Sequence, residues 1–110
     1  MYNIYLISTE INEKKYYKIG FTRRPVEVRV RELKTGNASD FEIIDAFTSE
    51  WGTKIESQLH RRYKSKRVNR EWFELDESDI KSFHSECQVI HNNLNYLKEN
   101  GNYFISKLAR

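Results

Sequence analysis

The sequence is poor in cysteine, glycine and proline, and it lacks any long apolar run. Cys87 is the only cysteine in 110 residues, so an internal disulfide and the paired-cysteine pattern of a zinc ribbon are both excluded. The four glycines do not cluster into a phosphate-binding loop or a dinucleotide fingerprint. No apolar run is long enough to cross a bilayer, and the residues after Met1 do not resemble a signal peptide. These absences predict one reduced domain in the cytoplasm, without membrane contact.

Aromatic side chains are plentiful by contrast. They make up 14% of the residues, mostly as tyrosine and phenylalanine, although 32% of the residues are charged. Disordered chains rarely carry so many large side chains that can be buried. A chain of this length can bury one modest core. We therefore expect one folded domain.

Charge is distributed unevenly along the chain, although the formal net charge is only +3. The segment from Lys14 to Lys34 (the first basic block) carries a net +6, the segment from Lys54 to Arg70 (the second basic block) carries another +6, and the rest carries −9. If both blocks share a face, they form a positive surface suited to phosphates; if they lie on opposite sides, they are ordinary solvated surfaces. Composition leaves both readings open. The candidate nucleic-acid contacts in these blocks are Arg23, Arg24, Arg31, Lys34, Arg61, Arg62, Lys66 and Arg67.

Short runs rich in aromatic and β-branched residues predict the strands. Tyr2–Ser8 and Tyr16–Phe21 read as an antiparallel hairpin joined by a loop of several residues. Phe41–Thr48 reads as a third strand, and Trp72–Leu75 as a short extended piece.

The segment after the hairpin gives conflicting signals. Val26–Arg31 alternates apolar and polar residues, which is the period of a strand. Pro25 before it and Gly36 after it are typical of the start and the end of a helix. We predict a helix within Arg24–Thr35. A second helix is predicted over Ser49–Lys64, where an apolar residue recurs every four positions.

The strongest helix signal covers Asp76–Asn100. Asp76 is a good N-cap, and Asn100-Gly101 is a typical helix end. The apolar residues follow a heptad spacing, which could pack on the same domain or join two chains. We favour a monomer over a homodimer through the seam from 80 to 97, because that seam is short for an independent coiled coil. The seam consists of Ile80, Phe83, Cys87, Ile90, Leu94 and Leu97.

A few side chains near the basic blocks are candidates for chemistry. Glu56 lies in the otherwise basic or neutral stretch K-I-E-S-Q-L-H-R-R, and His60 follows one helical turn later. A lone carboxylate among cations can hold a divalent metal when phosphate completes the coordination, or it can form a plain ion pair. Arg29 lies at the rim of the first helix, and Tyr5 in an apolar strand reads first as a core residue. The residues alone leave these alternatives open.

The order of these residues resembles the GIY-YIG nuclease superfamily. Asn3-Ile4-Tyr5 stands where that family has G-I-Y, and Lys18-Ile19-Gly20 where it has Y-I-G. The chain is most similar to a branch named after a bacteriophage open reading frame and related to meiotically up-regulated proteins. The branch has the motifs Y-K-I-G-x-T, R-x-x-E-L-x-T-G-N, I-E-x-x-L-H and E-W-F. Here they fall at Tyr17–Thr22, at Arg29 with Glu32–Asn37, at Ile55–His60 and at Glu71–Phe73.

The resemblance implies an α/β fold of the α+β kind, with a three-stranded antiparallel sheet flanked by helices. Residues 1–75 would form the nuclease core. Residues 76–110 would form a long C-terminal helix and a tail packed on the same domain.

The resemblance also assigns roles within a catalytic site. Tyr5 would activate the attacking water, Arg29 would bind the scissile phosphate, and Glu56 would hold a single Mg²⁺ or Mn²⁺. Tyrosine is a poor base because its ordinary pKa is near 10, so Lys18 or the metal would assist it. His60 belongs to the motif of this branch and would replace a polar group that is missing elsewhere.

Three departures from the superfamily leave the proton transfer open. Lys18 replaces a tyrosine, Leu33 lies where many members have Tyr or His, and Asn69 only approximates the place of a late asparagine. Our first hypothesis is a metal-dependent endonuclease that hydrolyses phosphodiester bonds in DNA, with RNA or branched DNA as other substrates. The alternative is a catalytically weak or inactive nucleic-acid-binding module on the same fold. By analogy with the branch we expect a phage or mobile-element protein, in the cytoplasm, at the nucleoid, or in the cytoplasm of an infected host.

Overall fold

The computed structural model describes residues 1–34 and 40–100. The predicted helix stop at Gly36, the motif residues Thr35–Asn37 and the tail after Asn100 lie outside the described residues, as does the side chain of Lys34. The division into a core at 1–75 and an appended helix and tail therefore stays a prediction.

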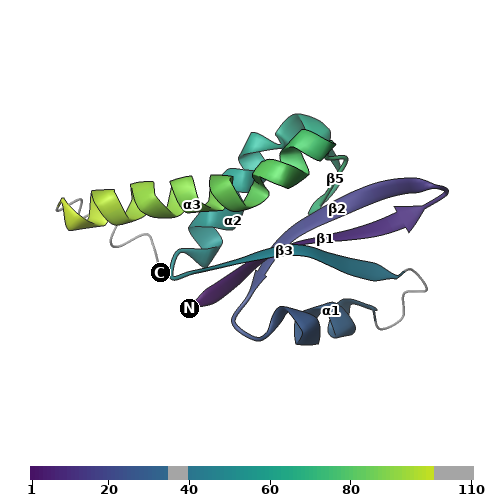
Figure 1. Cartoon of the computed structure of the whole chain (residues 1–110), viewed down its shortest axis with the longest axis horizontal. Helices are drawn as coiled ribbons and strands as arrows, with labels where there is room; N and C mark the ends of the chain where they lie inside the picture. The colour runs from purple at the N-terminus through teal and green to yellow at the C-terminus, as the bar shows by residue number, and fades with distance from the viewer. Residues whose placement is uncertain (35–39, 101–110) are drawn as a thin grey trace.

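The described part of the chain forms an α+β fold around one five-stranded antiparallel sheet with the order β3-β1-β2-β5-β4. β1 and β2 are long neighbours, β3 pairs with the other side of β1, and two very short strands continue the sheet beyond β2 (Figure 1). The strands are β1 Tyr2–Ile11, β2 Lys14–Thr22, β3 Phe41–Ser49, β4 Arg67–Asn69 and β5 Trp72–Phe73.

The prediction of a three-stranded sheet is wrong. β5 pairs only with Tyr17 and Lys18 of β2, and β4 pairs with β5 across a tight turn in which Arg70 has a positive φ of 46°. β4 consists of three exposed residues that show no apolar alternation, so it has no burial signal of its own. Its place in the sheet comes from its partner strand alone, which sequence periodicity does not register.

The β1–β2 hairpin is also longer than its apolar run. Its turn has only two residues, Asn12 and Glu13, with φ values of 52° and 67°. This is the left-handed pair that suits the twist of a hairpin, and asparagine tolerates it well. The hairpin ends beyond the core, where its residues are exposed, so Glu10, Ile11, Lys14 and Lys15 belong to strands rather than to a long loop.

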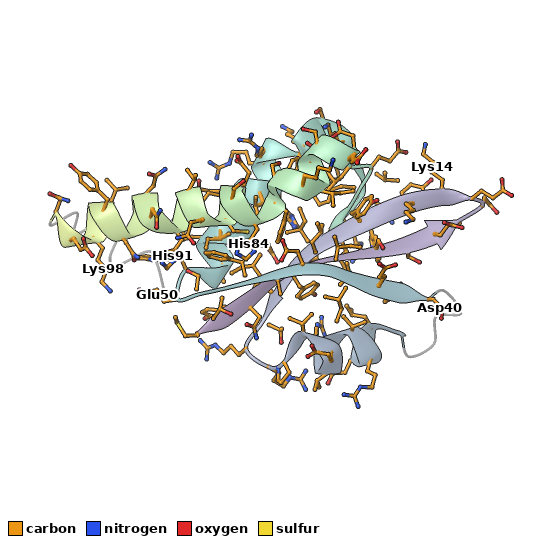
Figure 2. All side chains as sticks on the ribbon, viewed as in Figure 1. Lys14, Asp40, Glu50, His84, His91 and Lys98 are labelled. Carbon is orange, nitrogen blue, oxygen red and sulfur yellow. The ribbon has the colours of Figure 1, made fainter. Side chains whose placement is uncertain are left out.

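Three α-helices cover the sheet: α1 Val26–Lys34, α2 Gly52–Arg62 and α3 Glu77–Glu99, with a short 3-10 turn η1 at Lys64–Lys66. α1 lies on one face, and α2 and α3 lie on the other (Figure 1). The helix prediction after Pro25 is confirmed, because the Pro25 carbonyl accepts the first backbone bonds, from the N–H groups of Val28 and Arg29. In Figure 2, His84 and His91 lie on the side of α3 that faces β3.

The two faces of the sheet bury separate cores. The larger core lies under α2 and α3 and includes Trp51, Phe73 and Phe83. The smaller core lies under α1 and includes Tyr5, Ile7 and Val30. Since alternate residues of a strand point to opposite faces, β1 contributes to both cores.

α3 begins at a reciprocal cap. The Asp76 carboxylate accepts from the Asp79 N–H at 2.9 Å, and the Asp79 carboxylate accepts from the Asp76 N–H at 3.0 Å. Phe83, Cys87 and Leu94 of the predicted seam are buried in the larger core, so this part of the seam is used within one chain. No helix among residues 1–34 and 40–100 has the length and apolar character needed to span a membrane.

Candidate active site

Tyr5 lies flat across the neighbouring strand, and Gly20 makes this possible. The two residues are directly paired in the β1–β2 ladder, so the Tyr5 side chain leaves the sheet on the face where a Cβ at position 20 would lie. A Cβ atom at position 20 would lie 2.4 Å from the Tyr5 hydroxyl and 2.5 Å from Cζ. Only glycine allows this close approach. The Tyr5 hydroxyl therefore reaches over β2 toward its outer edge.

The surroundings of Tyr5 are strongly polar although its side chain is buried. Burial raises the pKa of Tyr5 above its ordinary value; a hydrogen bond and the positive charge of Arg29 oppose this, and the negative charges of Glu71 and Glu56 add to it. Tyr5 consequently keeps its proton at neutral pH. Arg29 is half exposed on α1, and its guanidinium also forms an ion pair with Glu32, with a nitrogen-to-oxygen distance of 3.5 Å.

Lys18 and Glu71 form an ion pair beside Tyr5. The Lys18 ammonium donates to the Glu71 carboxylate at 2.5 Å, and the Lys18 side chain is only 9% exposed. Glu71 lies in the tight turn between β4 and β5, next to Trp72, which pairs with Lys18 in the sheet. The two short strands that the sequence did not predict therefore carry Glu71 to the edge of β2.

α2 brings two further side chains to the same edge. One ligand atom from each of Glu56, His60 and Glu71 lies within 4.8 Å of the other two. The His60 Nε2–H donates to the Ile19 carbonyl at 2.8 Å, because a carbonyl oxygen can only accept. This bond leaves Nδ1 of His60 with a free lone pair. The arrangement is typical of a metal-binding histidine, whose other ring nitrogen is fixed by a backbone carbonyl.

Glu56 is partly buried. The pKa of Glu56 is raised to about 7, first by burial and then by the negative charge of Glu71, while the positive charge of Lys18 opposes the rise. Two carboxylates that share a partly buried position repel each other unless a cation or a proton lies between them. The pair therefore favours a divalent cation.

The structure brings together all five predicted catalytic residues. Tyr5 comes from β1 and Lys18 from β2, Arg29 comes from α1, and Glu56 and His60 come from α2. Their catalytic roles stay predictions.

Sequence reasoning missed Glu71 as a member of the site. Its signal was present in the E-W-F motif at Glu71–Phe73, which was recognised as a family pattern without a role. Only the turn that returns β5 to Lys18 shows where this carboxylate lies.

The cations of the first basic block are partly engaged on the surface. Arg23 donates to the Tyr2 hydroxyl at 2.6 Å and lies over its ring. Arg24 forms a two-pronged bond to Glu32, at 2.7 and 2.5 Å. Arg31 is exposed on α1. The side chain of Lys34, the other candidate of this block, is not among those the structure describes.

The cations of the second basic block differ in their partners and in how exposed they are. Arg61 is exposed on α2, and Arg62 pairs with Glu86 at 3.0 Å. Lys66 binds both carboxylates of the α3 cap, Asp76 at 3.2 Å and Asp79 at 2.5 Å. Arg67 lies 5.6 Å over the ring of Phe73. α1 and α2 cover opposite faces of the sheet (Figure 1), so the cations that these two helices carry do not share one face.

A sheet edge that gathers a tyrosine, an arginine, a lysine and a Glu-His-Glu cluster defines an α+β domain with a site suited to phosphate chemistry. The chain belongs to the T5orf172 domain family, whose model matches residues 3–100. This family is related to nuclease-type domains of the GIY-YIG and HNH-like kinds, so membership indicates a nuclease- or nucleic-acid-related role. No curated protein and no solved structure matches the chain. The resemblance is thus confirmed at the level of nuclease-type domains, and the particular GIY-YIG branch stays a prediction.

Proposed function

We propose that this protein is a metal-dependent endonuclease that hydrolyses phosphodiester bonds in DNA. The observation that supports the proposal best is the Glu56-His60-Glu71 cluster, whose ligand atoms all lie within 4.8 Å of one another beside Tyr5 and Arg29. Phosphodiester hydrolysis needs charge stabilisation on the phosphate and a positioned water, and these side chains are suited to both tasks.

The donor set fits one divalent cation. Glu56 and Glu71 offer carboxylate oxygens, and His60 offers Nδ1. Magnesium prefers oxygen ligands almost exclusively, whereas manganese also accepts an imidazole nitrogen, so we expect Mn²⁺ to be preferred over Mg²⁺. When bound, the ion would stabilise the charge that develops on the phosphate oxygens.

Arg29 and Tyr5 would act directly on the substrate. The guanidinium of Arg29 bonds to Tyr5 and contacts Glu32 at 3.5 Å, and a phosphate can replace the long Glu32 contact with a shorter hydrogen bond. Tyr5 is protonated at neutral pH, since burial raises its pKa, so its hydroxyl would orient the attacking water through a hydrogen bond. Proton transfer to Tyr5 would require the phenolate, which the charge of Arg29 favours. Lys18 would hold Glu71 in place.

The proposed phosphate contacts along the DNA come from both flanks of the site. Arg61 and Arg31 are exposed, and Arg62 and Arg24 have only surface ion pairs, which are weak enough to exchange for phosphate. Lys66 is the least available, because it binds two carboxylates of the α3 cap. The remaining proposed contacts are Arg23, Lys34 and Arg67.

The test is cleavage of supercoiled plasmid with Mn²⁺ or Mg²⁺. Wild type should nick the plasmid, and Glu56→Gln should be slower by a factor of about 100 or more, the usual loss when a group that stabilises developing charge is removed. Glu42→Gln is the matched control, since Glu42 is exposed on β3, and it should cut like wild type.

Two outcomes contradict the proposal. If wild type leaves the plasmid intact with both ions, the nuclease is not supported, and retention of labelled DNA by the same protein would favour the binding module instead. If Glu56→Gln cuts as fast as Glu42→Gln, the site is not where hydrolysis occurs.

A further inference from the structure

A pocket of about 340 Å³ lies next to the candidate active site and has no role in the proposed hydrolysis. Its walls come from the far end of the hairpin, from the start of β3, and from β4 and β5. Three of its lining side chains are aromatic and only partly buried: Tyr16, Phe41 and Trp72. Its volume is at the lower end of the range for small-ligand sites, about 300–1,000 Å³.

Trp72 connects this pocket to the active site. It follows Glu71 directly in the chain, and the Lys18 ammonium lies 5.9 Å from the centre of its ring. Trp72 also packs against Phe41, with ring centres 5.7 Å apart. The indole therefore contacts the charged cluster through Lys18 and also lines the aromatic pocket. A nucleic acid whose phosphate lies at the cluster would bring a nearby base to this pocket.

The polar groups of the pocket suit the edge of a base. Asn69 on β4 lines the pocket and is exposed, so its amide offers both a donor and an acceptor. The Thr9 hydroxyl already donates to the Asp40 carbonyl at 3.1 Å, so it is a fixed part of the wall. Flat aromatic walls with one amide at the rim are the features by which proteins hold a single unpaired base.

We propose that this pocket binds one unpaired nucleobase of the nucleic acid substrate, so that the enzyme prefers DNA with an extrahelical or single-stranded nucleotide at the cut. The inference rests on the proposed function, because it assumes a nucleic acid at the adjacent cluster. The three aromatic walls and the Asn69 amide at the rim support a base as the occupant over an aliphatic ligand, because they offer stacking surfaces together with a hydrogen-bond donor and acceptor.

The test measures binding without cleavage. Glu56→Gln protein is titrated in EDTA against two fluorescein-labelled duplexes of equal length, one fully paired and one with a single extrahelical nucleotide, and anisotropy gives both Kd values. The extrahelical duplex should bind about tenfold more tightly, which corresponds to about 1.4 kcal/mol and lies within the range for one stacked base. Trp72→Leu in the same background should remove this preference and leave the paired duplex nearly unaffected.

Matched variants keep the result interpretable. Tyr96→Ala removes an aromatic side chain that is 65% exposed on α3, away from the pocket, and should keep the preference. Tyr16→Leu is a second pocket variant, to be used if circular dichroism shows that Trp72→Leu is not folded. Trp72 emission gives a third readout in protein with an unaltered pocket, since the other tryptophan, Trp51, is buried. The extrahelical duplex should quench it more than the paired duplex.

The failures of the two proposals are distinguishable. If both duplexes bind equally well, or if Tyr96→Ala loses the preference as Trp72→Leu does, the base pocket is overturned and the nuclease proposal stands. If the protein binds neither duplex, the proposed function fails and the pocket proposal fails with it.

Discussion

Single residues at the edge of β2 are held in positions that a core alone would not require. Gly20 lets Tyr5 lie across β2, and His60 is fixed by the Ile19 carbonyl. Glu56 is left partly buried beside Glu71. Each arrangement lowers stability or restricts the residue choice locally, which is common at functional sites.

The raised pKa of Glu56 predicts a pH-dependent stability. Its folded-state pKa of about 7 lies above the ordinary value of 4.5, so the folded protein binds this proton more tightly. The stabilisation is complete below about pH 4.5 and is lost as the pH rises through about 7. The prediction is tested by urea unfolding in EDTA. Between pH 5 and pH 8, the free energy of unfolding of Glu56→Gln should rise by about 1–2 kcal/mol relative to that of wild type. This value is already reduced because Glu56 is partly exposed to solvent.

Manganese provides the control for this prediction. At pH 8 the added ion should stabilise wild type and leave Glu56→Gln unchanged, because a ligand stabilises only the protein that binds it. A constant difference between the two proteins from pH 5 to pH 8 would contradict the assigned pKa. Equal stabilisation by Mn²⁺ would contradict Glu56 as a ligand.

Gly20→Ala should disturb Tyr5 specifically. The new Cβ would overlap the Tyr5 hydroxyl and Cζ, so we expect a loss of about 1–3 kcal/mol in unfolding free energy, as for other overpacked sites. In a Tyr5→Ala background the same change should cost much less, because the overlapping atoms are gone. Thermal unfolding of the four proteins gives the coupling energy. Additive effects would show that the ring is not held over Gly20.

At the scale of elements, sequence periodicity predicted the helices and strands that bury apolar residues, and it missed the exposed strand that is held only by backbone pairing. The three long strands and three helices follow from apolar runs, from Pro25 and from the cap at Asp76. β4 was missed because its three residues are exposed. The active-site residues on long elements were found by motif, whereas Glu71 depends on a tight turn between two strands that tertiary pairing creates. Patterns of apolar residues indicate which positions are buried. The position of Glu71 depends instead on the pairing of β4 with β5, which these patterns do not reveal.

The attachment of α3 to the β3–α2 corner depends on a small polar network. The Trp51 Nε1–H donates to the Asn95 amide oxygen at 2.7 Å, and the Asn95 amide donates to His91 Nε2 at 3.0 Å. His91 Nδ1–H then donates to the Ser49 hydroxyl at 2.7 Å, which also accepts the Trp51 backbone N–H at 3.0 Å. One amide side chain thus satisfies groups on two helices.

Asn95→Ala should destabilise the protein by about 1–3 kcal/mol, because the buried indole N–H of Trp51 loses its acceptor. Asn93→Ala is the matched control: Asn93 is exposed on the same helix, and its removal should stay within about 0.5 kcal/mol. Urea unfolding followed by circular dichroism measures both. Equal effects would mean that the network does not hold α3 in place.

At the scale of the whole molecule, the near-neutral net charge conceals two basic flanks around one acidic cluster. α1 and α2 lie on opposite sides of the sheet, and each carries some of the cations of one basic block. The carboxylates of Glu56 and Glu71 lie close together with His60 of α2. A duplex that contacts both flanks would have to cross an edge of the sheet, and crossing at this cluster would bring its backbone to Tyr5 and Arg29. The charge pattern and the site therefore support the same path for DNA.

The salt dependence of DNA binding tests which cations lie on that path. Log Kobs should fall linearly with log salt for Glu56→Gln protein, and removal of one phosphate contact should reduce the slope by about 1. Arg61→Ala should show this reduction, since Arg61 is exposed on α2. Lys66→Ala should leave the slope unchanged and lower the Tm instead, because Lys66 binds the cap carboxylates Asp76 and Asp79. If Lys66→Ala reduces the slope and Arg61→Ala does not, DNA runs along the β4 side of the domain rather than over α2.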